Sequence, residues 1–178
     1  MEFLHCTMPE FAVLGKEGST HSSNSEWIKQ LWTEANSHFN EITELALRDD
    51  QGNLAGFWGA MTSLDRTFQP WENHLSVGLY LAGVQIPVET EAPKGWVKWI
   101  VPAFDYLYGQ VDGDPQTAVQ LGLEEIKRQG LALSGAIQEY YCPQENGAMY
   151  LFFPIKQNCN EKLRKCIRRE IDRYLCLC

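Results

Sequence analysis

The stretch LALSGAIQEYYCPQENGAMYLFFPIK, residues 131–156, predicts two strands joined by a turn at QENG, residues 144–147. Glu139 lies in the middle of the first strand and shares one side of the pleat with Ile137 and Tyr141, because alternate strand residues face the same way. A carboxylate among aromatic and apolar neighbours is either solvated at the rim of the sheet or positioned to contact a binding partner. Both interpretations stay open at this point.

The residues before this hairpin carry the start and stop signals of a helix. Asp114 is positioned as an N-cap, Pro115 occupies the first helical position, and Gly130 falls just past the end. Three apolar residues recur at helical spacing and form the predicted inner stripe: Val119, Leu123 and Ile126. A long strand at 95–111, interrupted at Pro102, precedes this helix.

The first half of the chain repeats this order of elements. Strand, helix, strand and strand are expected in EFAVLGKEG (10–18), SNSEWIKQLWTEANSHF (23–39), LAGFWGAMTS (54–63) and LSVGLYLAGVQIP (75–87). One face of the helix carries five apolar residues at helical spacing: Ile28, Leu31, Trp32, Ala35 and Phe39. Ser23 and Glu26 resemble a capping box at its start.

Two copies of a strand-helix-strand-strand unit predict an α+β fold, in which an antiparallel sheet carries two helices on one face. The junction between two such halves is a common place for a ligand. We therefore expect a ligand groove between the halves, on the face opposite the helices.

Composition narrows the class of protein. The chain has 178 residues, of which 44% are hydrophobic and 12% aromatic, so it is long enough for one domain with a substantial core. The net charge of −8 disfavours nucleic-acid binding and is compatible with cationic ligands. No secretory signal and no apolar run of membrane-spanning length is visible, so we expect no membrane partner, a cytoplasmic protein and mostly reduced cysteines.

Cofactor and metal chemistry is not indicated. The four histidines are scattered, and no phosphate loop, dinucleotide fingerprint, serine-hydrolase elbow or HExxH motif occurs. We therefore expect no cofactor and no metal.

The last stretch, residues 158–178, lies outside the repeat and predicts an amphipathic, cysteine-rich helix with six basic and three acidic residues between 161 and 173. It divides the chain into a domain at 1–157 and an appendix that could dock on a second copy of the chain or on a partner protein. Four thiols could also bind a soft metal, but their spacing matches no common zinc site, and packing is the simpler interpretation.

Aromatic residues on the predicted strands are the most informative feature. Strand alternation sends about half of them to the core and leaves the others for the groove. An aromatic groove with one partly buried carboxylate suits a flat, lipophilic cation. The expected ligand-binding residues are Glu139, Tyr141, Trp58, Tyr80, Trp96 and Tyr106, with Trp58 and Trp96 expected to report binding through their fluorescence.

Six segments together resemble the gyrase-inhibitor-like effector-binding domain, which is attached to many AraC-type and MerR-type multidrug-responsive activators. They are FAVLGKEG (11–18), IKQLW (28–32), YLAGVQI (80–86), GWVKWIVPAFDYLYGQVDG (95–113), GAIQEYYCP (135–143) and LFFPIK (151–156). The chain is also similar to stand-alone, integron-associated effector-binding proteins.

This resemblance implies a duplicated fold that binds varied lipophilic, often cationic compounds between its halves. It also implies that Glu139, in the penultimate strand, contacts the positive ligand. Some stand-alone members of the family hydrolyse strained cyclopropane-bearing toxins, so the resemblance leaves a hydrolase as the alternative function. No helix-turn-helix pattern flanks the module, so we expect no direct transcription activation by this chain. The segment after Lys156 matches nothing in the family, and its role stays open.

Overall fold

The computed structural model of the chain describes residues 1–20 and 26–157. The expected tail helix at 158–178 and the expected cap at Ser23 lie outside the described residues.

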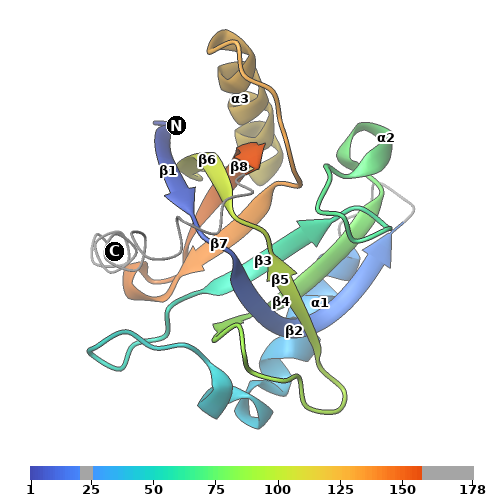
Figure 1. The fold of residues 1–178 in the computed structure, drawn as a ribbon, viewed down its shortest axis with the longest axis vertical. Coiled ribbons are helices and arrows are strands. Elements are labelled where there is room, and N and C mark those ends of the chain that lie inside the picture. Colours follow the sequence, from blue (N-terminus) through green and yellow to red (C-terminus); the bar gives the residue numbers. More distant parts are fainter. Residues whose placement is uncertain (21–25, 158–178) are drawn as a thin grey trace.

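One eight-stranded antiparallel sheet dominates the described part of the chain (Figure 1). Its strands are β1 (Leu4–Met8), β2 (Phe11–Thr20), β3 (Phe57–Thr62), β4 (Gly78–Ile86), β5 (Val97–Val101), β6 (Phe104–Gln110), β7 (Gln138–Cys142) and β8 (Ala148–Gln157). The two longer helices are α1 (Glu26–Ser37) and α3 (Pro115–Arg128). Short helical turns interrupt the connections at α2 (Glu72–Leu75), η1 (Phe39–Glu41), η2 (Thr43–Leu45) and η3 (Pro143–Glu145).

The strand order β1-β6-β8-β7-β3-β4-β2-β5 repeats one plan in both halves. β2, α1, β3 and β4 form the first unit, and β6, α3, β7 and β8 form the second. The middle strands β3 and β7 meet at the centre of the sheet, where they join the two units. The duplicated strand-helix-strand-strand fold is therefore confirmed.

The edges of the sheet differ from the sequence-based expectation. The single strand expected at 95–111 is two strands, β5 and β6, which separate at Pro102 because proline has no N–H to donate to a neighbouring strand. β5 pairs with β2, whereas β6 pairs with β8 and with β1, a strand that the sequence did not predict. β5, which precedes the second unit in the chain, thus extends the first unit, and β1, which precedes the first unit, extends the second.

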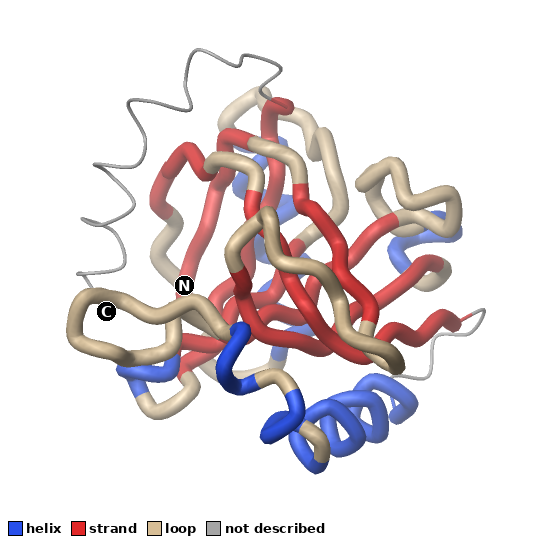
Figure 2. Tube along the Cα trace, turned by 60° about the horizontal axis from the view of Figure 1, so that its bottom comes forward, coloured by secondary structure: helices blue, strands red, loops and turns tan. Residues whose placement is uncertain are grey.

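The strand register shows which residues share a face of the sheet. Leu151, Glu139, Gly59 and Ala82 are paired in series across β8, β7, β3 and β4, and directly paired residues lie on the same face. Leu151 packs against buried residues of α3, and Ala82 packs against buried residues of α1. Both helices therefore lie on the face that carries Glu139, and Figure 2 shows α1 as the long blue helix below the red strands.

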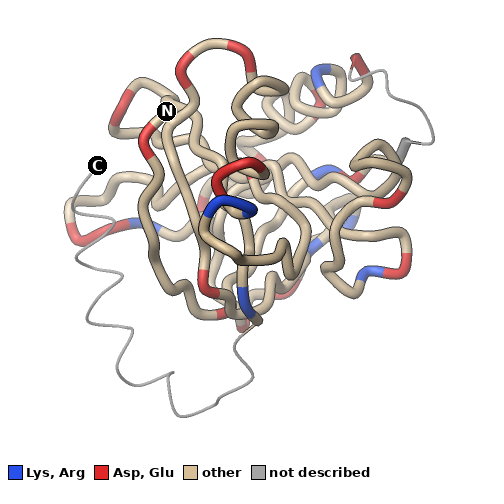
Figure 3. Tube along the Cα trace, turned by 90° about the horizontal axis from the view of Figure 1, so that it is seen from above, with Lys and Arg blue, Asp and Glu red and all other residues tan. Residues whose placement is uncertain are grey.

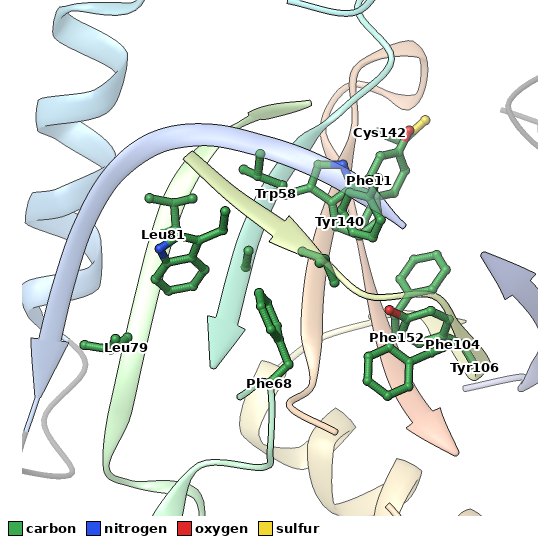
Figure 4. Packing of buried hydrophobic residues seen from close by; sticks show 14 residues of the cluster. Phe11, Trp58, Phe68, Leu79, Leu81, Phe104, Tyr106, Tyr140, Cys142 and Phe152 are labelled. Atoms are coloured by element: carbon green, nitrogen blue, oxygen red, sulfur yellow. The ribbon is translucent and has the colours of Figure 1, made fainter. Parts of the chain in front are cut away.

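The other face of the curled sheet encloses an aromatic core (Figure 4). Trp58 is 2% exposed, and its ring centroid lies 4.5 Å from that of Phe11 and 4.9 Å from that of Tyr140. The larger members of this cluster are Phe11, Trp58, Phe68, Trp99, Phe104, Tyr106, Tyr140 and Phe152. Packing of this density fixes the rings as structural elements of the core.

Helix α3 begins and ends as its sequence predicts. The Asp114 carboxylate accepts a hydrogen bond from the Thr117 amide (2.8 Å), and Gly130 adopts a positive φ of 69° after the helix.

The buried stripe of α3, however, differs from the expected one, since Val119 and Leu123 are only half-buried. The fully buried helical residues are Ala118, Gly122 and Ile126. A Cβ atom on Gly122 would overlap the ring of Phe153, so the helix makes its closest approach to the sheet through this glycine.

A buried glutamine closes the junction between the two halves. β3 and β7 pair through their backbones only at residues 57–59 of β3. Beyond that point the Gln138 side chain takes over: its Oε1 accepts from the Met61 amide (2.9 Å), and its Nε2 donates to the carbonyls of Met61 (3.0 Å) and Ala136 (2.8 Å). The Gln138 amide thus replaces a strand partner at a position that is 1% exposed.

Candidate functional site

The centre of the candidate site is the Glu139 carboxylate, which receives two phenolic hydrogen bonds. Tyr80 donates to Glu139 Oε2 at 2.5 Å, and Tyr141 donates to the same oxygen at 3.0 Å. The indole Nε1 of Trp32 in turn donates to the Tyr80 hydroxyl at 2.9 Å. We call these four side chains, together with Gly59 beneath them, the Glu139 site.

Strand register and one glycine place these groups together. Glu139 on β7 is paired with Gly59 on β3, and Tyr80 lies on β4, the next strand of the sheet. A Cβ atom on residue 59 would overlap the Tyr80 hydroxyl and would approach Glu139 Oε2 to 2.7 Å. Glycine at position 59 therefore provides the space in which the phenol reaches the carboxylate.

Tryptophans from helix α1 and from the β3–β4 connection wall the site. Trp32 packs edge-on against Tyr141, with ring centroids 5.2 Å apart, and Trp27 packs edge-on against Tyr80 at 6.1 Å. Trp71 stacks on Trp27 at 6.5 Å. The π faces of such rings and the carboxylate both attract positive charge.

A hollow of about 360 Å³ adjoins the Glu139 site. It is lined by Trp32, Asn36, Phe57 and Tyr141, so two of its walls are also part of the site. A volume of this order accommodates a small aromatic ligand.

Burial controls the protonation of the three titratable groups. It raises the pKa of Glu139 because the charged form loses hydration, while the hydrogen bonds from Tyr80 and Tyr141 act in the opposite direction. Burial, followed by the nearby Glu139 charge, raises the pKa of Tyr80 and of Tyr141 well above the ordinary value for a phenol. Both phenols therefore remain protonated at neutral pH and serve as donors.

The raised pKa of Glu139 predicts a pH dependence of stability. Its folded-state pKa lies above the ordinary value of 4.5, so the proton binds the folded state more tightly. Stability from this source is fully present below that ordinary value and is lost as pH rises through the folded-state pKa. We expect the unfolding free energy of Glu139→Gln, relative to the parent, to increase across this window in urea titrations. A flat difference for Glu139→Gln would contradict the burial of this charge.

Glu139 carries no cationic partner among the described residues, in contrast to a second carboxylate near aromatic rings. Glu17 accepts from the Trp99 indole at 2.8 Å and pairs with the Arg66 guanidinium at 2.7 Å. The described residues therefore supply a cation to Glu17, whereas they supply only neutral donors to Glu139. A partly buried charge without a counter-ion is the unusual feature of the Glu139 site.

The structure brings together three of the six residues that the sequence proposed for ligand binding. Glu139, Tyr80 and Tyr141 share the Glu139 site. Trp58 and Tyr106 do not join them, because strand alternation turns both toward the core on the other face (Figure 4).

Trp96 lies elsewhere again. It is 7% exposed and packs with Ile42 and Ala46 beside η1 and η2. Its indole donates to Glu41 at 2.9 Å, and the Lys16 ammonium lies 4.2 Å from its ring centroid. These internal partners account for its position without a ligand.

The expected face of the groove is corrected as well. The sequence placed the groove opposite the helices, yet Glu139 lies on the helix-bearing face. Its strand β7 stands between β8, which packs against α3, and β4, which packs against α1. The opposite face carries the aromatic core.

Sequence reasoning also missed several members of the site. Trp32 was assigned to the inner stripe of its helix, but it is only half-buried, whereas its neighbours Leu31 and Ala35 are buried. Gly59 and Phe57 gave no signal beyond strand propensity. The presence of two tryptophans, Trp27 and Trp32, on α1 was the available indication that this helix contacts more than a core.

The described residues include no group of three or more His, Cys, Asp or Glu side chains arranged to hold a metal ion. Within the same residues, no helix combines the length and apolar character needed to cross a membrane.

No family model matches the chain, and no curated protein matches it. Solved structures do share its fold. EcmrR in its complex with DNA matches with a TM-score of 0.60 and 11% identity over 88% of this chain and 58% of that chain. The isolated EcmrR C-terminal domain matches with a TM-score of 0.56 and 12% identity, over 88% of this chain and 98% of that one.

A third solved structure carries a ligand. SAV2435 bound to tetraphenylphosphonium matches with a TM-score of 0.55 and 16% identity, over 88% of this chain and 94% of that chain. At these identities the likeness shows a shared fold alone. The chain spans nearly the whole of the EcmrR C-terminal domain and 58% of the EcmrR chain in the DNA complex.

Proposed function

We propose that this chain is a receptor that binds lipophilic aromatic cations at the Glu139 site and thereby senses or sequesters them. The observation that carries this proposal is the partly buried Glu139 carboxylate, which is held by two phenols and has no cationic partner among the described residues. Keeping such a charge in the protein is unfavourable unless a ligand neutralises it.

The surroundings of Glu139 suit the aromatic part of such a ligand. The aromatic part would occupy the hollow lined by Phe57, Tyr141 and Trp32, with the positive charge directed at Glu139. A cation near a ring face gains about 0.5–2 kcal/mol, which adds to its attraction to the carboxylate. The net charge of −8 favours the approach of cations, and Figure 3 shows acidic positions on many of the loops.

The structural neighbours support the chemical class of the ligand. SAV2435, with the same fold, was solved with tetraphenylphosphonium, a lipophilic aromatic cation. EcmrR, whose C-terminal domain has the same fold, was solved in complex with DNA. We propose by analogy that residues 1–157 form the ligand-binding module and that ligand binding is read out in transcription regulation through a partner.

A hydrolase is the second candidate, and the observation that favours it is the pair of phenols that hold the Glu139 carboxyl beside the hollow. A carboxyl of raised pKa beside two protonated phenols can act as a general acid or base on an electrophile. Opening of a strained cyclopropane by water would add one water molecule to the compound. Incubation followed by mass spectrometry separates the two functions, because a receptor returns the compound unchanged.

The receptor proposal is tested with a pair of isosteric ligands on the parent protein. An arylmethyl trimethylammonium should bind at least about tenfold more tightly than its neutral analogue with a tert-butyl group, since only the charge differs. Tryptophan fluorescence reports both titrations. Trp32→Phe should remove most of the ligand-induced change, and Trp96→Phe, the matched control away from the site, should leave it intact. Equal affinity for the two ligands would overturn the receptor proposal.

A further inference from the structure

The hydrogen-bond donors of the Glu139 site are all used within the site. The Trp32 N–H is donated to Tyr80, and the hydroxyls of Tyr80 and Tyr141 are both donated to Glu139. An indole and a phenol each have a single donor proton. These three side chains therefore have no proton left to offer to a ligand.

The acceptor capacity of the site, in contrast, is only half used. An ionised carboxylate has about four acceptor positions on two oxygens. Both phenols bond to Glu139 Oε2, and no described residue donates to Oε1. Every donor of these side chains is thus in use, whereas one acceptor, the Oε1 oxygen of Glu139, has no donor among the described residues.

The orientation of the carboxylate is fixed by its surroundings. Tyr80 and Tyr141 hold Oε2 from two strands, β4 and β7, and the missing side chain of Gly59 lets the Tyr80 hydroxyl reach it. Anchoring one oxygen in this way leaves Oε1 as a preorganised acceptor, so a donor that meets it loses little orientational freedom in the carboxylate.

Resting on the proposed function, we propose that the Glu139 site selects cations that carry an N–H, such as protonated amines, amidines and guanidines, over permanently quaternary cations of the same size. An N–H donor can approach a carboxylate oxygen to about 2.8 Å and form a charge-assisted hydrogen bond. A quaternary cation keeps its charge behind alkyl groups and leaves Oε1 desolvated without a partner. The aromatic walls attract both kinds of cation, so the difference arises at Oε1.

Two isomeric cations test this selectivity. An arylmethyl group on N-ethyl-N-methylammonium has one N–H, whereas the same group on trimethylammonium has none, and both cations have the same atoms and the same charge. Their affinities for the parent protein are measured by calorimetry at about pH 7, together with the neutral tert-butyl analogue. We expect the N–H cation to bind about tenfold to a hundredfold more tightly than its quaternary isomer.

The outcomes separate this proposal from the proposed function. If the quaternary isomer binds equally or more tightly while both cations exceed the neutral analogue, the N–H selectivity is wrong and the receptor for cations stands. If the quaternary isomer does not exceed the neutral analogue, the receptor proposal fails, and the N–H selectivity that rests on it fails as well.

A variant locates the origin of the preference. Glu139→Gln exposes an amide that can present its NH₂ group where Oε1 stands, so the preference for the N–H cation should fall to about onefold. A preference that survives unchanged in the folded variant would place its origin outside Glu139. Glu124→Gln, an exposed substitution on α3 that keeps Glu139 and both phenols, should retain the preference.

Discussion

Replacing Gln138 with Met is expected to lower the free energy of unfolding by about 2–5 kcal/mol. Methionine has a similar length but cannot reproduce the amide, so the N–H and carbonyl of Met61 lose their partner at the junction of β3 and β7. Each buried polar group left without a hydrogen bond costs about 1–3 kcal/mol, and the Ala136 carbonyl loses a donor as well.

Urea unfolding of Gln138→Met measures this loss directly. The exposed Gln110→Met serves as the matched control and should change the unfolding free energy by less than about 0.5 kcal/mol. A loss below about 1 kcal/mol for Gln138→Met would show that the two halves do not depend on this amide for their junction.

Replacing Glu139 with Gln is expected to lower the affinity for an arylmethyl trimethylammonium by about 1–3 kcal/mol. The substitution keeps the shape of the side chain and an oxygen that can accept from Tyr80 and Tyr141, but it removes the negative charge. Because it also removes the unfavourable burial of that charge, the variant should fold at least as well as the parent at neutral pH.

Glu124→Gln on the exposed side of α3 is the matched control for the change in net charge. It should leave the affinity within about twofold of the parent, because exposed charges at a distance are screened by salt. An equal loss in both variants would assign the effect to the overall field of the protein instead of the Glu139 site.

Most of the fold could be predicted from the sequence because its signals are local. The cap at Asp114 and the glycine after α3 mark the ends of that helix, and strand-forming segments recur in the same order in both halves. Strand β1 escaped notice because its pairing with β6 joins segments about a hundred residues apart, and no local pattern reports such a partner.

The candidate site could be predicted only in part. Alternation along β7 correctly put Glu139 and Tyr141 on one side of the strand, but alternation alone does not tell which side the helices cover. The buried stripe of α3 illustrates the same limit, since the small residue Gly122 makes the closest contact with Phe153. Trp58 and Tyr106 were grouped with Glu139 because alternation does not identify the face of the sheet, although they belong to the core of the other face.

The measurement that tests the central claim most directly is a calorimetric cycle with two proteins and two ligands. The parent and Glu139→Gln are each titrated with the arylmethyl trimethylammonium and with its neutral tert-butyl analogue. A charge pair at the Glu139 site predicts that the substitution weakens cation binding by about 1–3 kcal/mol and leaves binding of the neutral analogue within about 0.5 kcal/mol of the parent. Equal changes for the two ligands, with a coupling free energy near zero, would contradict the assignment of Glu139 as the cation-binding residue.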